Sequence, residues 1–131
     1  MILVLAMTLG AAAAACDKDS SASNHEPRGA PKPKPKTVSP EAREMFNTRC
    51  ATCHGAEGKG NGPASAALNP KPRNYTDKSW QSTVTDEQIK KTITMGGAAV
   101  GKSPIMPASP DLDANADMLD GLVAIVRNFG N

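Results

Sequence analysis

Two cysteines and a histidine stand close enough together in this sequence to hold one cofactor. Residues 50–54 read Cys50-Ala51-Thr52-Cys53-His54, and this C-x-x-C-H spacing is the attachment motif of c-type haem. At the end of a helix, two cysteines three positions apart lie on neighbouring sides of one turn, so both thiols can reach the vinyl groups of one haem edge. The adjacent His54 then falls under the ring, where an imidazole nitrogen can bind the iron. We therefore predict one covalently bound haem c.

Other uses of Cys50 and Cys53 have weaker support. A zinc site would need two more ligands, but the chain has no second Cys/His pair, and His25, the only other histidine, lies in a polar segment. A thioredoxin-like dithiol would sit at a βαβ junction, and no such pattern surrounds the motif. A dithiol or a structural disulfide stays an alternative to haem.

Met106 is the methionine best placed to bind the iron opposite the histidine. Position excludes four of the six methionines, which belong to the leader, to the helix before the motif or to the last helix: Met1, Met7, Met45 and Met118. Met106 lies between Pro104 and Pro107, and these prolines stiffen its loop. Met95 and an open iron site are the alternatives. An iron held by histidine and methionine has no vacant position, and the thioether favours a relatively high reduction potential, so this ligand pair favours electron transfer.

The elements that must position these residues are helices. Residues 39–41, Ser-Pro-Glu, offer an N-cap, a proline at the first helical position and an acid in the first turn, so a helix begins there. Thr85 and Gln88 form a capping box for a second helix, which the glycine pair at 96–97 should end. No stretch shows sustained strand alternation, so the predicted fold class is all-α with long loops. A third helix is predicted from about residue 113 to residue 128, with an apolar side made of Met118, Leu119, Leu122, Val123, Ile125, Val126 and Phe129.

The start of the chain resembles an export signal that ends at a lipid site. Residues 2–15 are apolar apart from Thr8 and end in alanines. A bilayer span takes about 20 residues, and this shorter run has the length of a signal-peptide apolar region. The small residues before Cys16 resemble the lipobox of bacterial lipoproteins, which implies cleavage after Ala15 and acylation of Cys16. We therefore expect residues 1–15 to be a signal peptide, with simple secretion or an uncleaved anchor helix as alternatives.

Residues 16–39 are predicted to be a spacer between the lipid and a domain at residues 40–131. The spacer is polar and alternates proline and lysine over residues 31–36. Such a segment favours extended chain and cannot bury enough apolar surface to fold. Residues 40–131 contain ten basic and ten acidic residues, so the net charge of +2 arises in the spacer. Because the domain carries no concentrated basic stripe, nucleic-acid binding is not expected.

Residues 40–129 resemble a class I cytochrome c. Phe46 stands four residues before Cys50, where the family has an aromatic residue, and Ala42 stands eight before it, where a small residue lets two helices cross closely. The family's last-helix pattern Leu-Val-Ala-aromatic-Val-Arg is matched by residues 122–127, except that Ile125 replaces the aromatic residue. The resemblance implies three main helices and long loops around one covalently bound haem.

The resemblance also implies roles for residues around the haem. In similar small bacterial cytochromes, the proline of a Gly-Pro pair offers its carbonyl to the second nitrogen of the haem histidine. Pro63 stands in such a pair nine residues after His54, and Pro70 is its rival. A Met-Pro pair before the last helix resembles the family's distal loop. Related cytochromes bury a haem propionate against a segment whose side chains can donate hydrogen bonds to it, and here these side chains are Arg73, Tyr75 and Trp80. Alternatively, Tyr75 and Trp80 are core residues and Arg73 is a surface charge.

These expectations point to a lipid-anchored electron carrier on the periplasmic side of a bacterial membrane. Redox proteins are the expected partners, either membrane oxidoreductases or soluble carriers, with no nucleic acid and no small-molecule substrate. The protein should therefore not itself be an enzyme. A fixed cytochrome subunit of a larger oxidoreductase complex is the main alternative, and a haem-based ligand sensor would require that Met106 does not bind iron.

Overall fold

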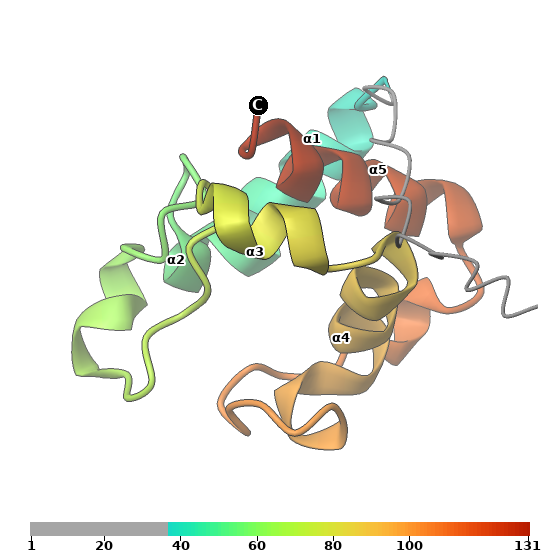
Figure 1. Ribbon diagram of the computed structural model, residues 1–131. Helices are drawn as coiled ribbons and strands as arrows, with labels where there is room; N and C mark the ends of the chain where they lie inside the picture. Colours follow the sequence, from blue (N-terminus) through green and yellow to red (C-terminus); the bar gives the residue numbers. More distant parts are fainter. Residues whose placement is uncertain (1–36) are drawn as a thin grey trace, which may run out of the picture. The chain divides into compact units, whose positions relative to one another are not determined.

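The computed structural model describes residues 37–131, and every regular element in this range is helical (Figure 1). The predicted all-α fold class is therefore confirmed for this part of the chain. The predicted signal peptide, the predicted lipid site at Cys16 and the part of the predicted spacer before Thr37 lie outside the described residues. In chain order the elements are α1 (Pro40–Met45), η1 (Phe46–Cys50), α2 (Ala51–His54), η2 (Pro63–Ala67), α3 (Lys78–Thr83), α4 (Asp86–Ala99), η3 (Pro110–Leu112) and α5 (Ala116–Asn128).

The first helix begins where the sequence predicts it. The Ser39 hydroxyl accepts a hydrogen bond from the backbone N–H of Ala42 at 3.1 Å, and Pro40 occupies the first turn. The helix then widens into the π-helical turn η1, where the N–H of Ala51 donates to the carbonyl of Phe46, five residues earlier. Such a turn holds one residue more than an α-turn. It therefore changes the direction in which the residues of α2 point relative to α1, a feature that the sequence pattern did not predict.

The second predicted helix has the expected cap and an irregular end. In α4 the Thr85 hydroxyl accepts from the N–H of Gln88, and the Gln88 side chain accepts from the N–H of Thr85. Gly96 breaks the helix with φ of +77°, and a short piece continues to Ala99. A Cβ at Gly96 would lie 2.8 Å from the backbone nitrogen of Ala108, so glycine is required where the next loop returns.

Two elements differ from the sequence prediction. Helix α3 was not predicted, although Asp77 accepts from the N–H groups of Ser79 and Trp80 and so caps it. Helix α5 begins at Ala116 rather than near residue 113, because the Asn115 side chain accepts from the N–H of Met118 at 3.1 Å and forms the cap. The chain just before this cap forms the separate 3-10 turn η3.

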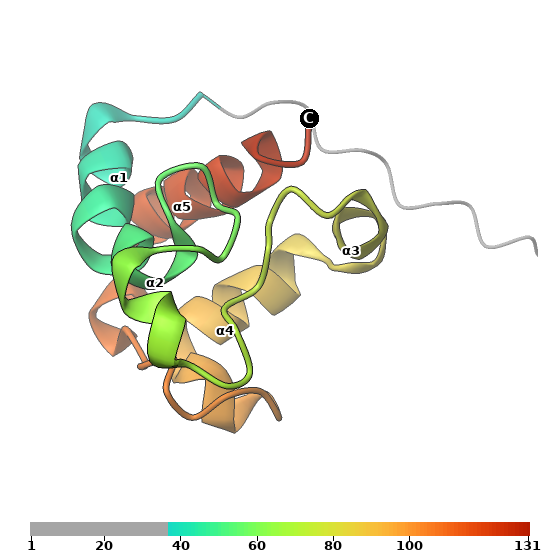
Figure 2. The ribbon, with the colours of Figure 1, turned by 90° about the vertical axis from the view of Figure 1, so that its left-hand side faces the viewer.

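Helices α1 and α5 cross closely and form the centre of the core (Figures 1 and 2). Ala42 is fully buried, and a Cβ at Gly121 would lie 2.6 Å from the Cβ of Ala42. The expectation that a small residue at position 42 permits a close crossing is therefore met, and Gly121 supplies the matching space on α5. The largest fully buried side chains around this crossing are Phe46, Leu122, Val123 and Ile125.

None of the helices within residues 37–131 combines the length and the apolar character that a bilayer crossing needs.

Arg127 ties the end of α5 to α3, to the start of α4 and to the residues between them. Its Nε donates to Asp86 at 2.8 Å, its Nη1 to the carbonyl of Gln81 at 2.9 Å, and its Nη2 to the carbonyl of Val84 at 2.7 Å. The side chains of Arg127 and Asp86 are only 15% and 20% exposed. The guanidinium thus satisfies one carboxylate and two carbonyl groups that water reaches poorly.

We expect an Arg127→Met variant to lose about 3 kcal/mol of unfolding free energy, because Asp86 would stay partly buried without its cation. Chemical denaturation of the haem-loaded protein measures the loss. The matched control is Arg49→Met, which removes the ion pair with Asp111. Those side chains are 50% and 52% exposed, so the control should cost less than about 1 kcal/mol. Equal losses in the two variants would show that Arg127 is no more than a surface charge.

Candidate functional site

The three side chains of the C-x-x-C-H motif lie together at the end of the first helical segment. Cys50 is the last residue of η1, while Cys53 and His54 belong to α2. Both cysteines are free and half-buried. Burial raises the pKa of Cys50 to about 11, and the opposing effect of the nearby Arg49 charge is smaller. Cys50 is therefore a neutral thiol at pH 7.

The loop after the motif is fixed to the carbonyl groups that end the helix. The N–H of Gly60 donates to the carbonyl of His54 at 2.7 Å, and the N–H of Gly62 donates to the carbonyl of Cys53 at 3.1 Å. A Cβ at Gly62 would overlap the carbonyl oxygens of Ala51 and Thr52. Because these helix-end carbonyls need partners, the glycines allow the loop to approach and satisfy them. These hydrogen bonds thus fix the position of the motif relative to the glycine loop.

The imidazole of His54 has a defined partner on each nitrogen. Nδ1 lies 3.2 Å from the carbonyl oxygen of Arg73, and Nε2 lies 3.1 Å from the hydroxyl of Tyr75. A carbonyl can only accept, so we assign the proton to Nδ1, and the Tyr75 hydroxyl then donates to the lone pair of Nε2. Burial lowers the pKa of His54, which favours this neutral form. His54 therefore presents the nitrogen lone pair that a metal ligand needs.

The structure places a different carbonyl at Nδ1 from the one predicted, and a role of Pro63 beside a bound haem stays a prediction. The carbonyl of Arg73, and not that of Pro63, faces this nitrogen. The path of the chain explains the difference: a Cβ at Gly60 would overlap the carbonyl of Pro72, so the segment of residues 72–73 lies directly against the glycine loop under His54. Pro63 instead begins η2, and its rival Pro70 follows a cis peptide bond.

The structure brings Arg73, Tyr75 and Trp80 together, and Tyr75 lies against His54. The guanidinium of Arg73 lies 5.8 Å from the centre of the Trp80 ring and 3.7 Å from Asp77. Tyr75 is buried in the core, its ring 5.6 Å from that of Trp80. A role of the three side chains at a haem propionate stays a prediction. In the structure the three side chains pack against one another, and the ring of Tyr75 also packs against His54.

Sequence reasoning missed the role of Gln81. Its side-chain amide donates to the carbonyls of Tyr75 at 2.7 Å and Val126 at 2.8 Å. It therefore joins the residues beside His54 to the last helix. A polar residue in a helix of six residues has no pattern that announces such a contact, and α3 itself was not predicted.

Met106 belongs to a separate part of the structure, the loop that follows α4. Its carbonyl accepts from the N–H of Gly97 at 3.0 Å and its N–H donates to the carbonyl of Ser103 at 3.3 Å. The side chain is half-buried. Both ribbon views draw this loop below α2 (Figures 1 and 2). The fold thus anchors Met106 by its backbone, apart from the group around His54.

The donors and the apolar surface available here fit a haem. Two thiols, a neutral imidazole and a thioether are the side chains that bind such a group through its vinyl carbons and its iron. Ile105 precedes Met106 in the sequence, and Met95 lies two residues before Gly97, which bonds to the Met106 carbonyl. The residues Met95 and Ile105 are 50% and 51% exposed. Large apolar side chains left open around a candidate ligand are surface that a flat apolar cofactor would cover.

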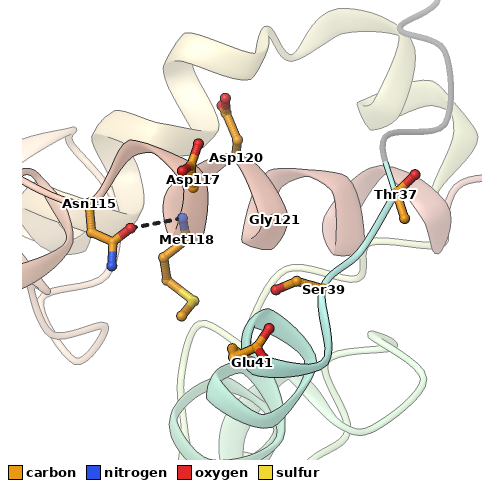
Figure 3. Close-up of a pocket in the computed structure, with 8 residues that line it drawn as sticks. All are labelled: Thr37, Ser39, Glu41, Asn115, Asp117, Met118, Asp120 and Gly121. Carbon is orange, nitrogen blue, oxygen red and sulfur yellow. Dashed lines mark hydrogen bonds between the residues drawn. The ribbon is translucent and has the colours of Figure 1, made fainter.

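A cavity elsewhere in the domain does not coincide with this site. It has a volume of about 520 Å³ and lies between the start of α1 and the start of α5 (Figure 3). In that view the Met118 side chain points toward α1, which agrees with its predicted place on the apolar side of the last helix. None of the lining residues is a predicted haem residue: they are Thr37, Ser39, Glu41, Asn115, Asp117, Met118, Asp120 and Gly121.

Comparison with protein-family models matches residues 39–124 to the family described as Cytochrome c. This range includes the motif, the loop of Met106 and most of α5. No curated protein and no solved structure matches the chain.

Proposed function

The chain belongs to the cytochrome c family, and on that basis we propose that it is a class I cytochrome with a single haem, anchored to a membrane through Cys16. The family membership means that the domain binds haem c covalently, with Cys50 and Cys53 in the C-x-x-C-H spacing, and that it carries electrons rather than catalysing a reaction. The proposal adds the number of haems, the iron ligands and the anchor. A single motif in the sequence supports one haem.

The observation that carries the assignment of ligands is the state of His54. Because the Arg73 carbonyl accepts the Nδ1 proton, it holds the ring in one tautomer and makes Nε2 the stronger donor. The thiols of Cys50 and Cys53 would hold the haem edge by thioether bonds from the same end of the helix. When bound, the haem supplies one-electron exchange between ferric and ferrous iron.

Met106 would complete the site from the loop after α4. Its thioether is a neutral, soft ligand that stabilises the ferrous form, and it would leave no position for an exchangeable ligand. The backbone contact with Gly97 supports this role because it fixes the loop on a helix end. Comparing wild type with a Met106→Ala variant for carbon monoxide binding and reduction potential tests the proposal, since a closed iron distinguishes a carrier from a ligand sensor.

The anchor proposal rests on the sequence before the domain. Residues 1–15 would be a lipoprotein-type signal peptide, and residues 16–39 would be a spacer on the periplasmic side of a bacterial membrane. A spacer of some 20 residues at about 3 Å per residue reaches about 60 Å. It would let the domain move between redox partners in the membrane and in solution while staying attached.

We expect a Cys16→Ser variant to leave the membrane fraction and appear as soluble cytochrome, because a lipid chain supplies the membrane affinity. Fractionation followed by haem staining measures the change. Mass spectrometry of the wild-type N-terminus should find an acylated Cys16. The control is Ser20→Ala in the same segment, which should stay in the membrane fraction. An unmodified Cys16, or a variant that stays with the membrane, would contradict the lipid anchor.

A further inference from the structure

The ring of Tyr75 lies flat against the imidazole of His54. The two ring centres are 4.5 Å apart and the planes differ by 12°. Tyr75 is buried, so this contact forms part of the core rather than a surface contact. Offset parallel rings at this separation attract each other beyond the burial of their area. The face of His54 is thereby covered by one aromatic residue.

Tyr75 is itself held on several sides. Its backbone N–H donates to the carbonyl of Gly58 at 2.7 Å, and its carbonyl accepts from the side chain of Gln81 at 2.7 Å. Its ring is also 6.3 Å from that of Phe129, nearly parallel to it. A side chain so restrained cannot turn without breaking contacts in the core. It is therefore a rigid platform for the histidine.

The hydrogen bond from Nδ1 to Arg73 does not by itself fix the imidazole plane, because carbonyl oxygens accept over a broad range of directions. A flat contact over the ring face does restrict rotation about the Cβ–Cγ bond. We propose that Tyr75 is a positioning residue that sets the orientation of the His54 imidazole plane when this residue binds iron. The inference rests on the proposed role of His54 as an iron ligand.

The ring of Tyr75, and not its hydroxyl, is the part that acts in this proposal. The hydroxyl donates to Nε2, the lone pair that a bound iron uses, so this hydrogen bond cannot persist in the loaded protein. The stacking contact uses the face of the imidazole and is compatible with iron at its edge. Tyr75→Phe should therefore preserve the orientation, and a residue without a ring should not.

The test compares the proton spectra of the oxidised, haem-loaded proteins. The orientation of the axial imidazole decides how unpaired spin is shared among the four pyrrole rings, and the shifts of the four haem methyl groups report it. Wild type and Tyr75→Phe should share one pattern of methyl shifts. Tyr75→Met, in which a flexible side chain refills the space, should lose that pattern. The band from the methionine sulfur to iron should persist in all three.

A core substitution away from the histidine serves as the control. Ile89→Ala on α4 removes buried apolar volume and should keep the wild-type pattern. The inference is overturned if Tyr75→Met keeps the pattern, if Tyr75→Phe loses it, or if Ile89→Ala changes it as much. In wild type, nuclear Overhauser contacts between the Tyr75 and His54 rings should be present, and their absence overturns it without any variant. A wild-type spectrum that lacks histidine–methionine ligation would instead contradict the proposed function.

Discussion

Replacing both Cys50 and Cys53 by alanine is expected to abolish covalent haem and cooperative unfolding together. The helices are short: α1 and α3 have six residues each and α5 has thirteen. Isolated helices below about 12–15 residues are marginal in water, so their stability depends on a shared core. With only four aromatic residues in the whole chain, that core has little aromatic surface to compensate for the loss of a bound haem.

Acidified acetone and circular dichroism measure the two losses. Haem should stay with the wild-type polypeptide. Any haem that the double variant retains should be extracted completely. The helical signal of the variant should be weak and should change gradually on heating, without a transition. The matched control is Thr52→Ala, an exposed residue between the two cysteines, which should keep both properties. A helical, haem-free variant with a sharp transition would show that the protein alone forms the core.

A Met106→Ala variant is expected to stay folded, bind carbon monoxide readily in the ferrous state and have a lower reduction potential. Folding should persist because the bonds from Cys50 and Cys53 are unchanged. Removal of the thioether would expose an iron position that wild type closes, and it would remove a ligand that stabilises the ferrous form. The weak sulfur-to-iron band of the oxidised protein should disappear. Visible spectroscopy of the oxidised protein follows the band, a potentiometric titration gives the reduction potential, and addition of carbon monoxide to the ferrous protein measures its binding.

The matched control is Met95→Ala, because Met95 was the other methionine that position alone did not exclude. Its side chain is half exposed on α4, so its removal should leave the band, the potential and carbon monoxide binding close to wild type. If Met95→Ala produces these changes and Met106→Ala does not, the iron ligand is Met95 and not Met106. If ferrous wild type binds carbon monoxide rapidly at neutral pH, the iron is open and the protein is a ligand-binding haem protein.

Several features of this protein could be predicted because their signals are local. The helix starts at Ser39 and Thr85 depend on side chains that reach backbone groups three residues away, so the sequence contains both partners of each hydrogen bond. The spacing of Cys50, Cys53 and His54 likewise lies within one turn. Helix α3 had a local signal too, the cap at Asp77, but its six residues show no apolar period that would have identified it.

The surroundings of His54 were decided by tertiary structure. Arg73 and Tyr75 lie 19 and 21 residues after it in the chain, and they meet it because the segment of residues 72–75 packs on the glycine loop. Every residue carries a carbonyl, so no residue type marks the one that will accept from Nδ1, and the structure places Arg73 there where the sequence pointed to Pro63. The sequence by itself determined the helical class, the haem motif and the helix caps, which depend on neighbours in the chain. Only the packing of distant loops determined which groups hold the histidine, because that choice depends on backbone paths that short-range patterns do not encode.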